Sequence, residues 1–253
     1  MSLDQRGDRP VHYPADPNKF SFDREVAPIF PDMARRSIPN YEAFHRTHAR
    51  MVARWFIKDK GTRILDVGAS RGEFFYQLQQ FYIDSGLTRP PMQRVALDNS
   101  EAMCGHLRIE FPDVEVRQQA LDEPLFTANE EQFDIINCTY VLQFIHPDKQ
   151  LNVLRKLISM LSPHGVLILG QKEAHEGALG HMLHEEYIRW RIDNGYTREE
   201  IEAKNRALAG SMWPMHPYVL RAALKHHFTE IAETSRFAMF TTLFCMKGGK
   251  RDD

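Results

Sequence analysis

The chain has few cysteines, no long apolar run and no excess of one charge sign. Cys104, Cys138 and Cys245 form no CxxC pair, which argues against a metal centre built on cysteine and indicates reduced thiols. No apolar stretch approaches the ~18–20 residues that cross a bilayer. The polar opening MSLDQRGDRP has no apolar signal-peptide core. We therefore expect a cytoplasmic protein with no membrane partner.

Charge and length further limit the classes of protein to which the chain can belong. Acidic residues outnumber basic ones by 34 to 32, for a formal net charge of -2, so no bulk field draws the chain to nucleic acid. A local basic patch, and with it an RNA partner, stays open. The 253 residues, 43% of them hydrophobic, suit one large domain with an insertion.

The N-terminal part divides into three pieces. Residues 1–19 are polar and contain three prolines, which predicts a flexible arm. Residues 20–40 are apolar but cut by prolines, so we expect short pieces that form a lid over the main domain. Residues 41–57 carry an apolar stripe at helical spacing. We assign 20–57 to the lid and its helix.

The rest of the chain, 58–247, first alternates between strand-like and helix-like patterns, and this alternation then stops. Strands are expected at 64–67, 95–97, 114–117, 133–138 and 166–170, and helices at 73–81, 101–111 and 147–161. Residues 174–227 are then almost wholly helical, which we interpret as an inserted cap. The last two β-like runs, 228–235 and 239–246, are too close for a crossover helix and should pair antiparallel.

This order predicts an α/β Rossmann-like fold of the class I methyltransferase type. Its seven-stranded sheet would be mostly parallel, with helices on both faces and an antiparallel strand at the C-terminus.

The sequence ILDVGASRGEFF, residues 64–75, carries the cofactor argument. A strand runs through Asp66 into Gly68, Ala69, Ser70 and Gly72, and a helix follows. Glycine permits close approach of a ligand to the backbone, and the helix start presents free N–H groups. In enzymes that use S-adenosylmethionine (SAM), such a loop cradles the amino-acid part of the cofactor.

A second anchor follows 30 residues after Gly68. Asp98 ends the next strand, where a carboxylate accepts hydrogen bonds from both ribose hydroxyls, as in dinucleotide-binding folds. Asn99 can reach the adenine. The glycine loop, the acidic residue Asp98 and the alternation of strands and helices together favour a SAM site over the simpler interpretation that the glycines only make a tight turn.

Two other enzyme classes share parts of this loop. Gly68 to Gly72 matches the G-x-S-x-G elbow of α/β-hydrolases, but here it follows the first clear strand and no HGG-type run precedes it. The dinucleotide fingerprint G-x-G-x-x-G is absent because Ser70 and Glu73 occupy its second and third glycine positions. Neither a serine nucleophile nor a nicotinamide enzyme is favoured. No HExxH motif supports a zinc site, and we predict no metal.

From about residue 20 to 247 the chain resembles the carboxy-S-adenosylmethionine synthase family. FDREVAPIFPDMARRSIPNY (22–41) is the most specific match, and LDNSEAM (97–103), LSPHGVLIL (161–169) and NGYTREEI (194–201) are also similar. The resemblance implies carboxylation of the SAM methyl group with prephenate, a homodimer, and a role in tRNA wobble-uridine modification. By position it implies SAM contacts at Tyr41, Gly68, Ala69, Ser70, Asp98 and Asn99.

The chain departs from that family at several places. The family holds the product carboxylate with an arginine in the cap, where this chain has Asn205, followed by Arg206. A neutral amide keeps only part of a charge-assisted hydrogen bond, and a helical neighbour points about 100° away. The family's Asp-Ile pair near adenine is Ala120-Leu121 here, and its asparagine after the fourth strand is Thr139.

Three functions follow from these observations. The first is a SAM-dependent methyltransferase acting on a small or anionic acceptor; such a displacement needs alignment more than acid–base groups, and the sequence identifies no catalytic residue. The second is a carboxy-SAM synthase-like enzyme, with Arg206 as the cation near the methyl group. The third is a non-catalytic SAM-binding subunit.

Overall fold

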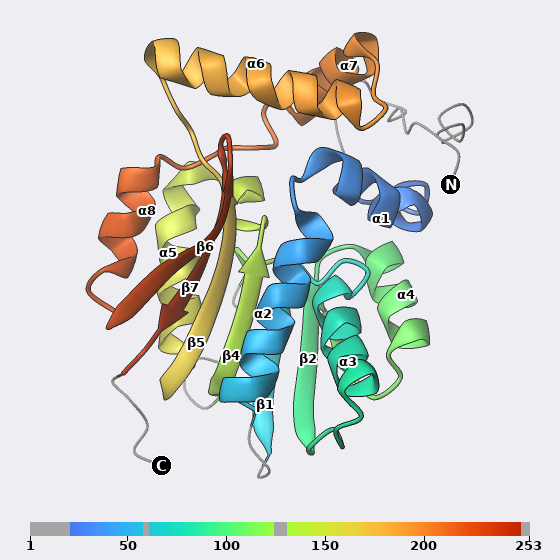
Figure 1. The fold of residues 1–253 in the computed structure, drawn as a ribbon, viewed down its shortest axis with the longest axis vertical. Coiled ribbons are helices and arrows are strands. Elements are labelled where there is room, and N and C mark those ends of the chain that lie inside the picture. Colours follow the sequence, from blue (N-terminus) through green and yellow to red (C-terminus); the bar gives the residue numbers. More distant parts are fainter. Residues whose placement is uncertain (1–20, 58–60, 124–130, 249–253) are drawn as a thin grey trace.

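The computed structural model describes residues 21–57, 61–123 and 131–248. Within them a seven-stranded sheet has the order β3-β2-β1-β4-β5-β7-β6 (Figure 1). The strands are β1 (Thr62–Val67), β2 (Met92–Asp98), β3 (Glu115–Gln118), β4 (Phe133–Thr139), β5 (Leu161–Lys172), β6 (Glu230–Phe237) and β7 (Phe240–Met246). Only β7 pairs antiparallel with its neighbours β5 and β6. The predicted class I fold is confirmed.

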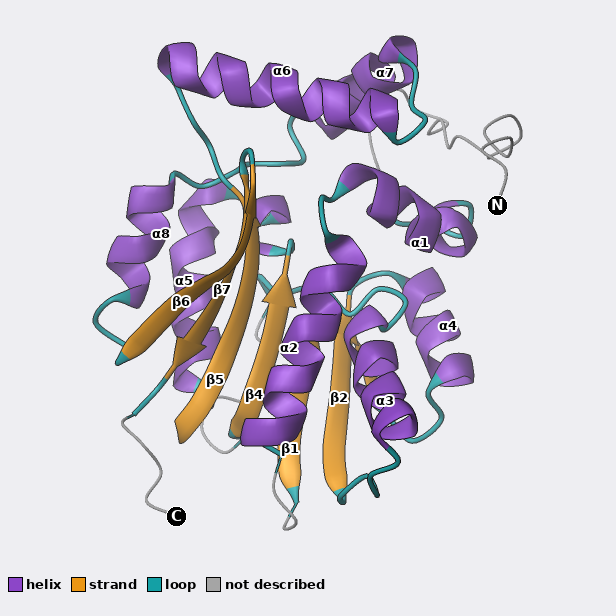
Figure 2. Cartoon of the chain, in the orientation of Figure 1, coloured by secondary structure: helices purple, strands orange, loops and turns teal. Residues whose placement is uncertain are grey.

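Helices cover both faces of the sheet (Figure 2). On one face lie α2 (Tyr41–Trp55), α3 (Glu73–Ser85) and α4 (Glu101–Glu110), whose apolar side chains pack on Ile64, Ile135 and Ile168. The central strands bury side chains on both faces, which is why they read as continuous apolar runs.

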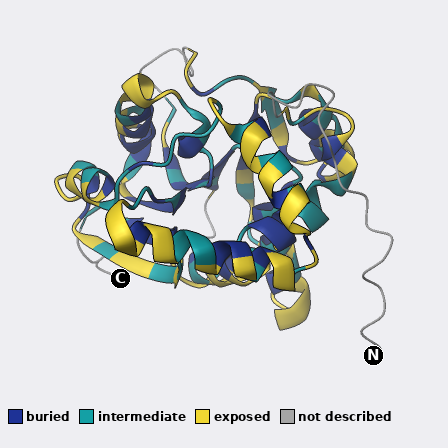
Figure 3. Ribbon diagram, turned by 90° about the horizontal axis from the view of Figure 1, so that it is seen from above, coloured by how far each residue is buried: buried dark blue, intermediate teal, exposed yellow. Residues whose placement is uncertain are grey.

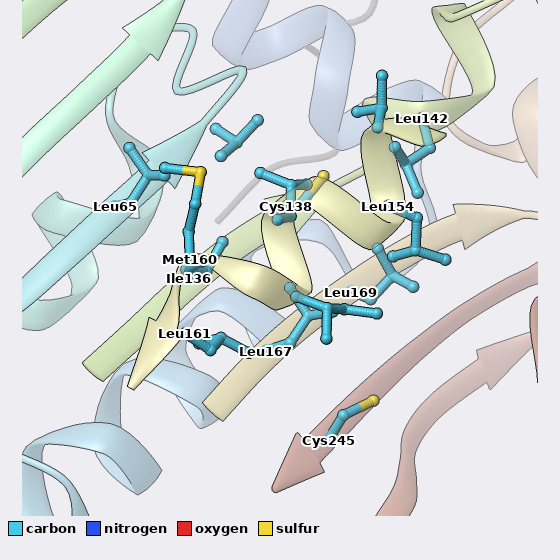
Figure 4. Packing of buried hydrophobic residues seen from close by; sticks show 14 of the residues in the cluster. Leu65, Ile136, Cys138, Leu142, Leu154, Met160, Leu161, Leu167, Leu169 and Cys245 are labelled. Carbon is cyan, nitrogen blue, oxygen red and sulfur yellow. The ribbon is translucent and has the colours of Figure 1, made fainter. Parts of the chain in front are cut away.

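The second face is covered by α5 (Pro147–Ser159) and α8 (Pro217–Leu224). Leu154 of α5 packs there with Leu65, Ile136 and Leu167 of three neighbouring strands (Figure 4). Leu220 and Leu224 of α8 belong to the same cluster. Thus α8, the last helix of the predicted 174–227 block, lies against the sheet.

Three helices lie beyond the carboxyl edge of the parallel strands: α1 (Val26–Ser37), α6 (Gly177–Asp193) and α7 (Arg198–Leu208). Figure 3, which looks down on this edge, shows exposed residues on the outer sides of these helices. We call α1 the lid and α6 with α7 the cap. A short 3-10 turn, η1 (Leu142–Phe144), follows β4.

The lid is one helix, not the short pieces that its prolines predict. Pro28 lies in the first turn, where backbone N–H groups have no partner in any case. Pro31 cannot bond to the carbonyl of Ala27, four residues earlier. That carbonyl instead accepts a 3.0 Å hydrogen bond from Arg71, so the missing helical bond is replaced from the glycine loop.

The strand expected at 166–170 is longer in the structure, because β5 begins at Leu161. The register between β4 and β5 shifts from Phe133↔Leu161 to Ile135↔Val166. The intervening residues form an irregularity in the strand, where Pro163 needs no ladder hydrogen bond. The preceding helix ends at Ser159. The predicted arm, 1–19, lies outside the described residues.

Candidate active site

A cavity of about 1460 Å³, open solvent at its mouth included, lies at the carboxyl edge beneath lid and cap. It sits where β1 separates β2 from β4, the point at which the chain reverses its direction of strand addition and where open α/β sheets bind ligands. Its polar lining residues are Ser37, Tyr41, His45, Asp66, Ser70, Glu73, Asp98, Asn99, Gln119, Asn137, Thr139, Tyr140, Gln143, Lys172, Tyr187, Arg191, Lys204 and Asn205.

The glycine loop forms one side of the cavity with strained backbone. Gly68 has φ +60, and a Cβ there would lie 2.4 Å from a methyl group of Val141. Ser70 also has a positive φ of 51, unusual for a residue with a side chain. Gly72, the N-cap residue of α3, has φ +76, and a Cβ there would meet the Phe111 ring at 2.5 Å. The missing Cβ of Gly68 thus leaves room for Val141, whereas that of Gly72 lets α3 pack on α4.

Asp98 is fixed at the end of β2. One carboxylate oxygen accepts from the backbone N–H of Ser70 (2.8 Å) and the other from that of Ser100 (2.9 Å). Burial raises the pKa of Asp98, against the effect of these backbone bonds. Each oxygen retains accepting capacity, so the carboxylate can bind a pair of ligand hydroxyls.

An acidic wall continues from there across β1, β4 and α3. Asn137 donates to Asp66 Oδ1 over 2.7 Å, and burial raises the pKa of Asp66 to about 7. Glu73, the first residue of α3, also lines the cavity, and burial raises its pKa. Tyr41 lies close enough to both carboxylates that, after burial, they are the largest causes of its raised pKa.

A second set of lining residues, which we call the cationic wall, is basic. Lys172 ends β5, Arg191 comes from α6 and Lys204 from α7, and all three line the cavity. Within the described ranges none forms an ion pair with a carboxylate. Burial, and then Arg191, lower the pKa of Lys172 to about 8 and that of Lys204 to about 7. The charges crowd one another, which favours an anion between them.

Hydrogen bonds join the lid to the cap above these charges. Tyr187 of α6 donates to the Ser37 carbonyl over 2.7 Å, and Lys204 donates to the Ser37 hydroxyl over 2.9 Å. Tyr196 lies 3.0 Å from the same hydroxyl. The end of the lid is therefore held by the cap residues that surround the cationic wall.

The cavity brings together most of the residues that the sequence singles out. These are Tyr41, Asp66, Gly68, Ala69, Ser70, Asp98, Asn99, Leu121, Thr139 and Asn205. Gly72, Ala120 and Arg206 do not line it. Arg206 is exposed on α7, so the geometry does not support it as the cation of the site. Asn205 instead accepts a 3.3 Å hydrogen bond from Arg191.

Sequence reasoning missed His45, Glu73, Asn137, Lys172, Arg191 and Lys204. Two of these left a signal, because Asn137 interrupts an apolar strand and Lys172 comes two residues after the strand expected at 166–170. The cap cations left none, since charged residues are usual on helices.

Two absences hold for residues 21–57, 61–123 and 131–248. No three histidine, cysteine, aspartate or glutamate side chains there are grouped so as to hold a metal ion. No helix there is both long and apolar enough to span a membrane.

The chain is similar to several known proteins. Residues 64–165 match the family model described as a methyltransferase domain. Carboxy-S-adenosyl-L-methionine synthase of Vibrio cholerae is 32% identical over 205 residues, covering 77% of this chain and 78% of that protein. The protein of the same name from Wolinella succinogenes is 28% identical, covering 91% and 94%.

Solved structures give the same fold at low identity. The plantazolicin methyltransferase BpumL, in complex with a triazolic desmethylPZN analog and SAH, superposes with a TM-score of 0.62 at 11% identity, covering 90% of this chain and 92% of that one. The CMeT domain of citrinin polyketide synthase gives 0.61 at 13% identity, covering 89% and 57%.

Proposed function

This chain belongs to the family of carboxy-S-adenosyl-L-methionine synthases, and we propose that it joins a carboxyl group to the methyl carbon of SAM. It is a SAM-dependent transferase of the class I methyltransferase fold. The family resemblance suggests prephenate as the carboxyl donor. Such a donor is an anion, so the site must hold a cationic cofactor and an anionic second substrate together.

The cationic wall is the observation that supports this proposal. Lys172, Arg191 and Lys204 approach one cavity from three elements, without carboxylate partners in the described residues. Buried charge without an opposite charge is costly for a folded protein, whereas a bound carboxylate would offset this cost through charge-assisted hydrogen bonds. Arg191, which contacts Asn205, would supply the positive charge that Asn205 lacks.

The acidic wall suits SAM in the remaining space. Asp98 would accept from the ribose hydroxyls, and the backbone at Gly68 would pass close to the methionyl part. The sulfonium supplies the electrophilic activation of the methyl group when SAM is bound. The chain's residues would orient the two substrates, exclude water beneath lid and cap, and stabilise the negative charge of the donor.

The reaction can be tested directly with purified protein, SAM and prephenate. Mass spectrometry should reveal SAM in which a carboxyl group replaces one methyl hydrogen, together with phenylpyruvate. The new C–C bond joins the methyl carbon to the carboxyl carbon of prephenate, whose ring loses that carboxyl group and its hydroxyl group as it becomes aromatic, and the released hydroxide and the methyl proton leave as water. S-adenosylhomocysteine (SAH) together with a methylated acid would instead establish ordinary methyl transfer to an anionic acceptor. That result would overturn the carboxylation proposal while leaving the transferase assignment intact.

Arg191→Gln tests the cationic wall. We expect the KM for the anionic substrate to rise by about 10-fold or more, because a charge-assisted hydrogen bond contributes roughly 1.5–3 kcal/mol. SAH affinity should stay unchanged.

The matched control is Arg189→Gln, which replaces an exposed arginine on the same helix. Its KM for the anionic substrate and its SAH affinity should both match those of the wild type. An unchanged KM in Arg191→Gln, or an equal effect of both variants, would exclude Arg191 from substrate binding.

A further inference from the structure

Helix α2 carries three arginines on its outer side, which we call the arginine row. Arg46, Arg50 and Arg54 are spaced four residues apart, and all three are exposed. Four residues advance a helix by about 6 Å and turn it by about 40°, so these side chains leave one face of α2 along its axis. Figure 1 shows α2 at the front of the molecule, where no other element covers it. The arginine row therefore faces solvent.

The charge of the arginine row is not neutralised within the described part of the chain. None of the three arginines forms an ion pair with a carboxylate there. The only acidic residue of α2, Glu42, pairs instead with Arg35 of the lid. Like charges four residues apart on a helix repel one another. A bound chain of negative charges would relieve that repulsion.

An exposed tryptophan lies at the end of the row. Trp55, the last residue of α2, directly follows Arg54 and is 75% exposed, although tryptophan is on average a highly buried residue. The apolar side of α2 packs on the sheet through Val52 and Phe56, so the helix has no free apolar face of the kind that binds a membrane surface. What it offers is a line of cations with a flat ring at one end.

We propose that the arginine row and Trp55 together form a docking surface for single-stranded nucleic acid. Guanidinium groups bind phosphate oxygens through paired hydrogen bonds, and a base can stack on the exposed indole ring. Contacts to phosphates carry no sequence information, so this surface binds without strong sequence preference. None of its four residues lines the cavity. The inference is therefore independent of the reaction proposed above.

Fluorescence anisotropy with a labelled single-stranded oligouridylate tests the proposal at several salt concentrations. For the wild type, log Kd should rise with log salt concentration with a slope of about 2, because each phosphate contact on a single strand contributes ~0.7. The double variant Arg46→Gln/Arg50→Gln should lower this slope to about 0.7 and weaken binding by about 10-fold or more at low salt. Thermal unfolding like that of the wild type verifies that the variant is folded.

Arg155→Gln is the matched control, because it removes an exposed arginine of α5 on the other face of the sheet. Its affinity and salt slope should match those of the wild type.

The contribution of Trp55 is separable from that of the charges. Trp55→Leu should weaken binding by about 5-fold or more and leave the salt slope unchanged, because it removes a stacking surface and no charge. Trp55→Phe keeps an aromatic ring and should retain most of the affinity.

Other outcomes would overturn the proposal in distinguishable ways. An unchanged affinity and slope in the double variant, or an equal loss in Arg155→Gln, would exclude the arginine row as a specific docking surface. If the wild type does not bind the oligonucleotide at low salt, the row is only a solvated surface. Wild-type binding to phosphatidylserine vesicles or to polyglutamate, with none to the oligonucleotide, would assign the row to a membrane or to an acidic protein.

Discussion

Gly68 has no room for a side chain. A Cβ would lie 2.4 Å from a methyl group of Val141, and the φ of +60 is strained for any L side chain. We expect Gly68→Ala to lower SAH affinity by at least about 10-fold, because relief of this clash must move the loop whose Ser70 N–H holds Asp98. It should also destabilise the fold by about 1–3 kcal/mol.

Gly105→Ala is the control for that measurement. Gly105 lies within α4, and a Cβ there meets nothing within 4 Å. Alanine should therefore leave SAH affinity unchanged and stabilise the helix by roughly 0.5–1 kcal/mol. Wild-type binding by Gly68→Ala would mean that the loop does not position the cofactor.

The residues that the sequence reveals are those whose role is local. Gly68 and Asp98 stand at fixed places relative to a strand end, and a pattern of neighbouring residues is enough to find them. Lys172, Arg191 and Lys204 come from three elements and meet only when α6 and α7 fold over the sheet. The family comparison directed attention to Asn205 and Arg206, yet the cation that contacts Asn205 comes from another helix.

At the scale of elements, the lid depends on the cap for its position. Tyr187 donates to the Ser37 carbonyl at the end of α1 from a fully buried hydroxyl. Tyr187→Phe leaves that buried carbonyl without its donor, at a cost of about 1–3 kcal/mol. We expect faster hydrogen exchange of the α1 amides, measured by mass spectrometry, with no change in α3.

The control for the lid is Tyr218→Phe, since Tyr218 is 69% exposed on α8. That variant should exchange like the wild type throughout. If Tyr187→Phe left α1 protection unchanged, the remaining contacts of Ser37 with Tyr196 and Lys204 would be sufficient to hold the lid.

The elements themselves were predictable wherever their signals were periodic. The alternation of strands and helices gave the sheet, and the close spacing of the last two runs gave the antiparallel β7 pairing. The lid could not be predicted as one helix, because the replacement of its missing hydrogen bond by Arg71 depends on a tertiary contact. The position of α8 also depends on packing, which its sequence alone does not distinguish from a place in the cap.

For the whole molecule, the net charge of -2 does not show that the cavity contains one group of acidic and one group of basic side chains. Its lining contains Asp66, Glu73 and Asp98 from β1, α3 and β2, and three cations from β5 and the cap. Formal charge sums cancel this separation, so composition could not reveal it. This division would let one cavity receive the cationic cofactor and the proposed anionic substrate at once.

The same burial makes the fold sensitive to acid through His45 on α2. Burial, and then His48, lower the pKa of His45 from 6.5 to about 3. Between these values the unfolded chain binds a proton that the folded chain does not, so the free energy of unfolding falls as the pH falls from about 6.5. This loss amounts to ~1.4 kcal/mol per pH unit for one group.

Leucine binds no proton in either state, so His45→Leu should escape this loss. The difference in unfolding free energy, variant minus wild type, should rise by up to ~1.4 kcal/mol for each unit by which the pH falls between pH 6 and pH 4. Urea unfolding at several pH values measures this difference, in which the contributions of titratable groups common to both proteins cancel. The His226→Leu variant, which removes an exposed imidazole, is the control for the loss of a histidine as such. A constant difference for His45→Leu would mean that protons reach this imidazole in the folded protein, and that the cavity floor beneath lid and cap is hydrated rather than closed.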